Sequence, residues 1–211
     1  MHSILILLCT TGFVAAADPI REDFESAKVG EMPKGWTIAK TGKGEGSVWK
    51  IVEDSTAPKG SKILSQVAKG PSALFNLCVC DAAKYQDVTV SVAFKANAGE
   101  LDQGGGLVWR YADADNYYIA RMNPLEDNFR LYKVVAGKRI QLATKEELKV
   151  APGTWHTIAV TMKGDAIVCS LDGKKHLEAK DDAIKAAGKV GLWTKADAQT
   201  SFDDFRAGEP K

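Results

Sequence analysis

The sequence has little net charge and few residues of the kinds that commonly mark a catalytic site. Lys and Arg total 28 and Asp and Glu total 27, so the formal charge is +1. This balance gives no general attraction to phosphates or anionic lipids, so we expect neither nucleic acid nor a membrane surface as a partner. The chain has only three histidines, and it has no His-Glu-x-x-His or Gly-x-Ser-x-Gly motif. Their absence argues against a zinc protease of that type and against a hydrolase with a serine elbow.

Long helical periodicity is also missing, and apolar residues instead recur at every second position. Val88, Val90, Val92 and Phe94 alternate with small or polar residues, and the stretch from Ile158 to Met162 does the same. This period of two is typical of half-buried strands. Turn-forming pairs separate the runs, and Asp172-Gly173 is the clearest of them.

Many short strands without long helices predict an all-β protein, either a sandwich or a barrel. Two short stretches, residues 145–148 and 181–187, are the only candidates for helix. No repeat or linker divides the chain, so we predict a single domain over residues 18–211.

The first residues have the pattern of a signal peptide. Ile4 to Ala16 is apolar and uncharged, and Ala15-Ala16-Ala17 fits the small-residue rule for cleavage after Ala17. No Arg or Lys precedes the apolar run, so an uncleaved anchor or a buried strand stays an alternative. We expect a secreted or periplasmic protein.

Three cysteines follow the predicted cleavage site, which is an awkward number for an exported chain. Cys78 and Cys80 would share one face of a strand, and neighbours at that spacing do not normally bridge each other. Cys169 could pair with either of them, or all three could be buried free thiols.

The chain contains the segments DFES, GWTIA, GGLVWRYADADNYYIARMNPLEDNFRLYKVVAGKRIQLA, GTWHTIAVTMKGDAIVCSLDGKKH and GKVGLWTKADAQTSFDDF. Together these segments resemble bacterial jelly-roll domains of the concanavalin A-like and laminin-G-like type, near the 3-keto-disaccharide hydrolase family. The resemblance implies a jelly-roll sandwich of two antiparallel sheets. It also implies a ligand on the concave sheet, most simply a carbohydrate. These families mix enzymes with binding modules, so the fold alone does not decide the activity.

Strand parity predicts which side chains would share that face. Aromatic rings stack on sugars, and planar polar groups bond to their hydroxyls. We therefore predict a ligand-binding face made of Arg110, Tyr117, Arg121, Asn128, Arg130 and Tyr132. The alternative is a solvated outer face with arginine stems covering apolar surface.

Carboxylates near the two ends of the domain suggest a structural calcium site. Asp23 lies near the start, and Asp203 and Asp204 lie near the end. Terminal strands of jelly rolls lie side by side, and calcium takes six to eight oxygen ligands. The alternative is a pair of charged strand edges that discourage edge pairing.

Catalysis is less clear from the sequence. The Glu-x-Asp-x-Glu run of jelly-roll glucanases is absent, which argues against a retaining glucanase. Cleavage of 3-keto-disaccharides, which the resemblance implies, would need a base and a group that stabilises an enolate. The arginines suit the second role, but Glu126, Asp127 and His156 are bases by residue type alone. We therefore predict a carbohydrate-binding domain, with a 3-keto-disaccharide hydrolase or lyase, or a structural module without a small ligand, as alternatives.

Overall fold

A computed structural model describes residues 18–211, and the predicted signal peptide lies outside the described residues. The described chain contains fifteen strands and no helix. They are β1 (Ile20–Glu22), β2 (Trp36–Thr41), β3 (Trp49–Glu53), β4 (Lys62–Gln66), β5 (Phe75–Tyr85), β6 (Val88–Ala98), β7 (Gly105–Asp113), β8 (Asn116–Asn123), β9 (Asn128–Val135), β10 (Lys138–Lys145), β11 (Trp155–Lys163), β12 (Ala166–Leu171), β13 (Lys174–Lys180), β14 (Gly188–Lys195) and β15 (Gln199–Gly208).

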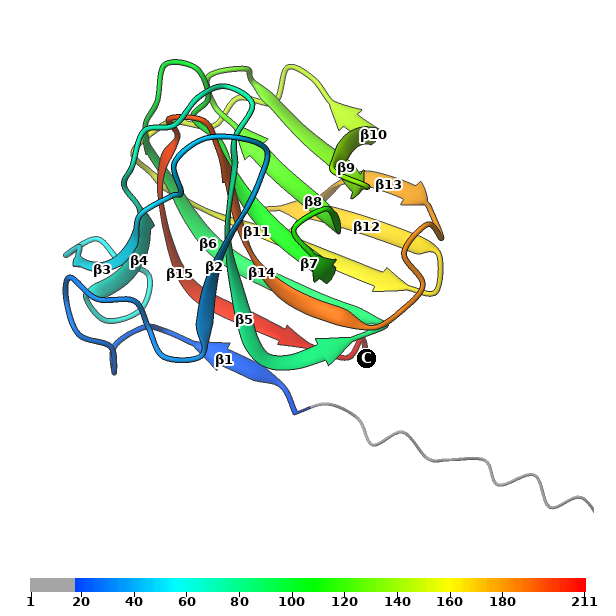
Figure 1. The fold of residues 1–211 in the computed structure, drawn as a ribbon, viewed down its shortest axis with the longest axis horizontal. Coiled ribbons are helices and arrows are strands. Elements are labelled where there is room, and N and C mark those ends of the chain that lie inside the picture. Colours follow the sequence, from blue (N-terminus) through cyan, green and yellow to red (C-terminus); the bar gives the residue numbers. More distant parts are fainter. Residues whose placement is uncertain (1–17) are drawn as a thin grey trace, which may run out of the picture.

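The strands form two antiparallel sheets that pack face to face (Figure 1). The seven-stranded sheet has the order β10-β9-β8-β7-β14-β5-β2. The eight-stranded sheet has the order β13-β12-β11-β6-β15-β4-β3, and β1 adds to it by pairing with β15. The prediction of a jelly-roll sandwich is confirmed. Neither candidate helix forms, because residue 145 ends β10, residues 146–148 are loop, and residues 181–187 are the loop between β13 and β14.

The main core lies between the sheets and follows the predicted alternation. β6 contributes Val88, Val90, Val92 and Phe94, which meet Leu107, Trp109 and Leu131 of the other sheet. The Asp172-Gly173 turn joins β12 to β13 as predicted. Burial of these side chains is the main stabilising term of the sandwich.

The three cysteines are free and buried, so the free-thiol alternative is the one observed. Burial raises the pKa of all three thiols. They are therefore protonated, poorly reactive parts of the core.

Trp155 differs from the other four tryptophans, which are buried. It is partly exposed, its indole N–H donates to Thr56, and Lys95 Nζ lies 5.0 Å from its ring. Within residues 18–211 there is no helix with the length and apolarity needed to cross a bilayer.

Candidate functional site

The outer face of the seven-stranded sheet, where a ligand was predicted, carries a second hydrophobic core. Tyr117 and Tyr132 share this face as predicted, but their exposed fractions are only 0% and 4%. Burial raises the pKa of the Tyr117 hydroxyl, which bonds to Thr41 Oγ1 at 2.6 Å. The core consists of Phe75, Leu77, Val79, Val108, Tyr117, Ile119, Tyr132, Val134 and Trp193.

Curvature of the sheet closes this face. The Arg139 guanidinium lies 4.5 Å from the Tyr132 ring and 5.0 Å from the Phe75 ring, although β9 and β5 are four strands apart in the sheet. Because neighbouring strands are about 4.8 Å apart, the sheet must bend strongly for one cation to touch both rings. The concave face is therefore filled by its own aromatic side chains, and neither tyrosine is free to stack on a sugar.

The placement of Arg110 on this face is wrong. The register between β7 and β8 shifts after Trp109, and Arg110 has a φ of 45°, so a β-bulge breaks the alternation on which the prediction depended. Its buried guanidinium donates to the backbone oxygens of Gln86, Gly164 and Ile184 at 2.6–2.8 Å. Arg110 thus ties three turns together at one end of the sandwich.

The other predicted polar residues do meet, at the opposite end of β8 and β9. Arg121 donates to Asn128 Oδ1 at 2.8 Å and to Glu126 Oε2 at 2.7 Å. Arg130 reaches the same Glu126 oxygen at 3.4 Å and Glu146 at 3.1 Å. Burial alone would raise the pKa of Glu126, but these donors outweigh it and lower that pKa. Glu126 is therefore ionised and shared between two arginines.

A buried aspartate that the sequence did not reveal joins this group. Asp102 lies in the loop 99–104, between β6 and β7, and is fully buried. Its Oδ1 accepts the Gly104 N–H at 2.8 Å, and a Cβ added at Gly104 would lie 3.3 Å from Asn123 Cβ. Asp102 therefore lies beside the end of β8. We call Asp102, Arg121, Asn123, Glu126, Asn128 and Arg130 the polar cluster.

The deepest part of the polar cluster has unused hydrogen-bonding capacity. Among the described residues, Asp102 Oδ2, Arg121 Nε and Asn123 Nδ2 are buried atoms without a hydrogen-bond partner. Burial raises the pKa of Asp102, and the charges of Arg121 and Lys195 oppose this only in part. Buried polar atoms are nearly always paired, so one acceptor and two donors left over in one place indicate a site for a polar group.

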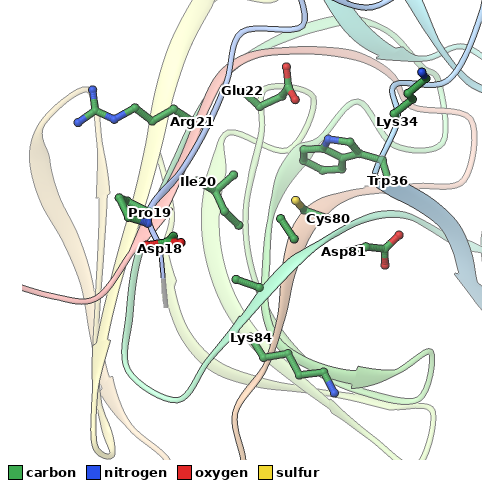
Figure 2. Close-up of a pocket in the computed structure, with 13 residues that line it drawn as sticks. Asp18, Pro19, Ile20, Arg21, Glu22, Lys34, Trp36, Cys80, Asp81 and Lys84 are labelled. Atoms are coloured by element: carbon green, nitrogen blue, oxygen red, sulfur yellow. The ribbon is translucent and has the colours of Figure 1, made fainter. Parts of the chain in front are cut away.

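A separate cavity of about 720 Å³ opens at the far end of β5 (Figure 2). Ile20, Trp36 and Cys80 line its floor, and charged residues such as Lys34 and Lys84 stand around it. None of the ligand-binding residues predicted from the sequence lines this cavity, and neither do the three unpaired atoms of the polar cluster.

The carboxylates predicted to bind calcium lie near one another but are differently exposed. Asp203 is fully buried and accepts N–H groups from Lys59 and Asp204 at 2.8 and 2.7 Å. Burial, and then the charges of Asp204 and Asp23, raise the pKa of Asp203 to about 6. Within residues 18–211 no group of three or more His, Cys, Asp or Glu side chains is arranged to hold a metal ion. A structural calcium site at Asp23, Asp203 and Asp204 stays a prediction.

His156 lies away from the polar cluster. Its ring nitrogens contact Asp172 at 2.7 Å and Thr154 at 2.8 Å, and Asp172 also accepts the Thr157 N–H. These contacts tie the start of β11 to the β12–β13 turn. Asp127, the remaining base considered from the sequence, has a φ of 51° in the β8–β9 turn.

Several solved structures share this fold. A carbohydrate-binding module, CBM66, from Bacillus subtilis is 18% identical, with a TM-score of 0.66 over 83% of this chain and 96% of that chain. A β-glucanase from Bacillus licheniformis is 13% identical, with a TM-score of 0.60 over 92% and 98% of the two chains. A protein of unknown function with a galectin-like fold from Bacillus subtilis is 13% identical, with a TM-score of 0.57 over 83% and 90%. At these identities the likeness concerns the fold alone.

A comparison with curated proteins finds no match. The model of one protein family, described as the 3-keto-alpha-glucoside-1,2-lyase-like domain, matches residues 23–207. This range includes every strand except β1 and the last residue of β15, and it includes every residue of the polar cluster. The family is the one that the sequence resemblance indicated. The chain therefore belongs to the 3-keto-alpha-glucoside-1,2-lyase-like family.

Proposed function

We propose that this domain binds a carbohydrate at the polar cluster, and not on the aromatic part of the concave face. The observation that carries the proposal is the set of three unpaired buried atoms on Asp102, Arg121 and Asn123. A sugar hydroxyl is both a donor and an acceptor, so it suits a place with two free N–H donors and one free carboxylate oxygen. Family membership and the fold shared with a carbohydrate-binding module support the same class of ligand.

The partly exposed residues of the polar cluster, Glu126 and Arg130, give a ligand a route from solvent to the buried ones. The side chains of Glu126 and Arg130 are 36% and 27% exposed, whereas that of Arg121 is 2% exposed. A ligand hydroxyl that donates to the partly exposed Glu126 carboxylate would approach Arg121 from the solvent side, with Asp102 beyond it.

Calorimetric titration with methyl α-glucoside and its 3-keto derivative tests this proposal. The wild type is expected to bind at least one of them, and Glu126→Gln is expected to weaken that binding about tenfold or more by removing a charged partner. Glu178→Gln is the matched control, because Glu178 is exposed and paired with Lys175 on the edge strand β13. Binding of neither probe, or equal affinity in the wild type and Glu126→Gln, would contradict the proposal.

A second candidate function is cleavage of a 3-keto-glucoside, and the position of Asp102 favours it. A raised pKa suits a carboxylate that accepts a proton near neutral pH. Asp102 Oδ2 has no hydrogen-bond partner, and it lies near the charge of Arg121 and 3.7 Å from Lys195 Nζ. We propose that Asp102 takes the proton from C2, next to the C3 ketone, and that the C–H electron pair forms an enolate. Arg121 and Asn123 N–H groups would stabilise the enolate oxygen.

The second half of that reaction restores the ketone. The enolate electron pair forms the C1–C2 double bond as the C1–O glycosidic bond breaks, and the leaving oxygen takes the proton from Asp102. The products are an unsaturated keto sugar and the free alcohol, and no oxidant is needed.

Product detection by mass spectrometry separates the two candidates. Asp102→Asn is expected to lower turnover of 3-keto methyl α-glucoside by about a hundredfold or more while binding persists. If the wild type binds the 3-keto glucoside without turning it over, cleavage is excluded and carbohydrate binding stands as the function.

A further inference from the structure

Two leucines are held in solvent at the edge of the polar cluster. Leu101 is 56% exposed and Leu125 is 50% exposed. Leu101 lies in the loop 99–104 and Leu125 in the turn 124–127, so each comes one or two residues from a member of the cluster. Single exposed leucines are common on protein surfaces, so their exposure alone has little meaning.

Both leucines are fixed to rigid backbone. The Asp197 carboxylate accepts the N–H groups of Glu100, Leu101 and Asp102 at 2.8–3.2 Å. The Leu125 N–H donates to Asn123 Oδ1 at 3.0 Å. A leucine on a mobile loop can fold back onto the protein, but these two stay exposed because their backbone is held in place.

The two loops lie against each other. A Cβ added at Gly104, at the end of one loop, would lie 3.0 Å from Met122 O and 3.3 Å from Asn123 Cβ, just before the other. Asp102 and Glu126 are also close enough for the charge of Glu126 to raise the pKa of Asp102. The loop that carries Leu101 and the turn that carries Leu125 therefore both adjoin the polar cluster.

The ion-paired side chains of the cluster and its rim balance in charge. Asp102, Glu126 and Glu146 are acidic, while Arg121, Arg130 and Lys195 are basic, and each acid has at least one of these cations as an ion-pair partner. This paired set has no net charge that would select a charged sugar, so its polar groups suit an uncharged one.

We propose that the ligand is an uncharged glycoside with an apolar aglycone. Its sugar lies in the polar cluster, and its aglycone lies against Leu101 and Leu125. This inference rests on the carbohydrate site proposed above and specifies its ligand. It explains why two rigid loops present apolar side chains next to a site whose other groups are polar.

Titration with methyl and hexyl α-glucosides, in parent and 3-keto forms, tests the inference. Five additional carbons that cover the leucines are expected to make hexyl glucoside bind about tenfold more tightly than methyl glucoside. The double variant Leu101→Ala, Leu125→Ala is expected to lose this preference while keeping its affinity for methyl glucoside. Val29→Ala is the matched control, because Val29 is 45% exposed and lies in the segment between β1 and β2.

The outcomes separate the two proposals. Methyl glucoside binding without a hexyl preference, or a preference that survives in the double variant, overturns the apolar-aglycone inference alone. Failure of every glucoside to bind overturns the carbohydrate site itself. Both leucines are exposed, so unchanged thermal unfolding of the double variant is expected and verifies its fold.

Discussion

Two arginines on neighbouring strands have different roles in this protein because their hydrogen-bond partners differ. Arg110 and Arg121 are both almost fully buried. Arg110 donates to three backbone oxygens and one carboxylate group lies 3.5 Å away, so its donors are used by the fold. Arg121 is held by two side chains and keeps an unpaired Nε. Only Arg121 has hydrogen-bonding capacity left for a ligand.

Replacing Arg110 tests its structural role. Arg110→Met is expected to lower the free energy of unfolding by about 3 kcal/mol, because three hydrogen bonds from a buried charged group to backbone oxygens of the turns are lost. Arg110→Lys should lower the free energy of unfolding by less, since a lysine can still donate to some of these backbone oxygens. Urea unfolding measures both, and a Met variant as stable as the wild type would refute this role.

Asp203 gives the stability a pH dependence. Its pKa is about 6 in the folded protein and about 3.9 in an unfolded chain. The folded state therefore binds more protons between these values, and stability should fall as the pH rises from about 4 to about 6, by on the order of 2 kcal/mol. Between pH 4 and pH 6 the unfolding temperature of the wild type should fall as the pH rises, and that of Asp203→Asn should change less. Parallel profiles would contradict the assignment.

Calcium would act on the same residue. If it binds at Asp203, added calcium should raise the unfolding temperature of the wild type at pH 7 but not that of Asp203→Asn. An equal response of the two proteins would exclude a calcium site at Asp203.

Among the loops, the conformation of loop 99–104 depends on Asp197, which follows it by nearly a hundred positions in the sequence. Burial raises the pKa of Asp197, but the backbone N–H groups of residues 100–102 outweigh this and lower it. Gly99 has a φ of 146°, and a Cβ there would lie 1.8 Å from Asp102 O, so only glycine fits this start of the loop. The Asp197 carboxylate and the backbone conformation at Gly99 together hold Leu101 and Asp102 in place.

Removing the anchor should loosen this loop without unfolding the sandwich. Asp197→Ala is expected to speed amide hydrogen exchange in residues 99–104 by about tenfold or more, because three N–H groups lose their acceptor. Exchange in the core strand β6 should change far less. Unchanged protection of the loop would mean that other contacts fix it.

The sequence indicated part of this site and missed the rest for physical reasons. Arg121, Asn128 and Arg130 were found because they follow regular strand alternation on β8 and β9. The bulge at Arg110 broke that alternation, and Asp102 lies in a loop where no period applies. Glu126 was noticed as an acid, but its contacts with two arginines depend on the turn that brings it back over β8.

For the whole molecule, alternation was enough to predict an all-β sandwich or barrel, because each inward face must be apolar. The family resemblance was needed to choose the two-sheet jelly roll. Alternation could not predict that the seven-stranded sheet bends so strongly that the Arg139 guanidinium contacts the rings of both Tyr132 and Phe75. The outward tyrosines looked like a sugar platform and are instead a second core. Because aromatic side chains fill this face, the candidate site lies at the ends of β8 and β9 and in the adjoining loops. The cavity beside Trp36 shares no lining residue with it.

The most direct test of this account is an NMR titration of the isotope-labelled protein with methyl α-glucoside and its 3-keto derivative. Backbone amide shifts are expected to cluster in residues 99–104, 121–130 and 195–197, where the polar cluster and its anchors lie. Shifts centred on Ile20, Trp36 and residues 81–84, or no shifts with either sugar, would contradict the claim that the polar cluster is the carbohydrate site.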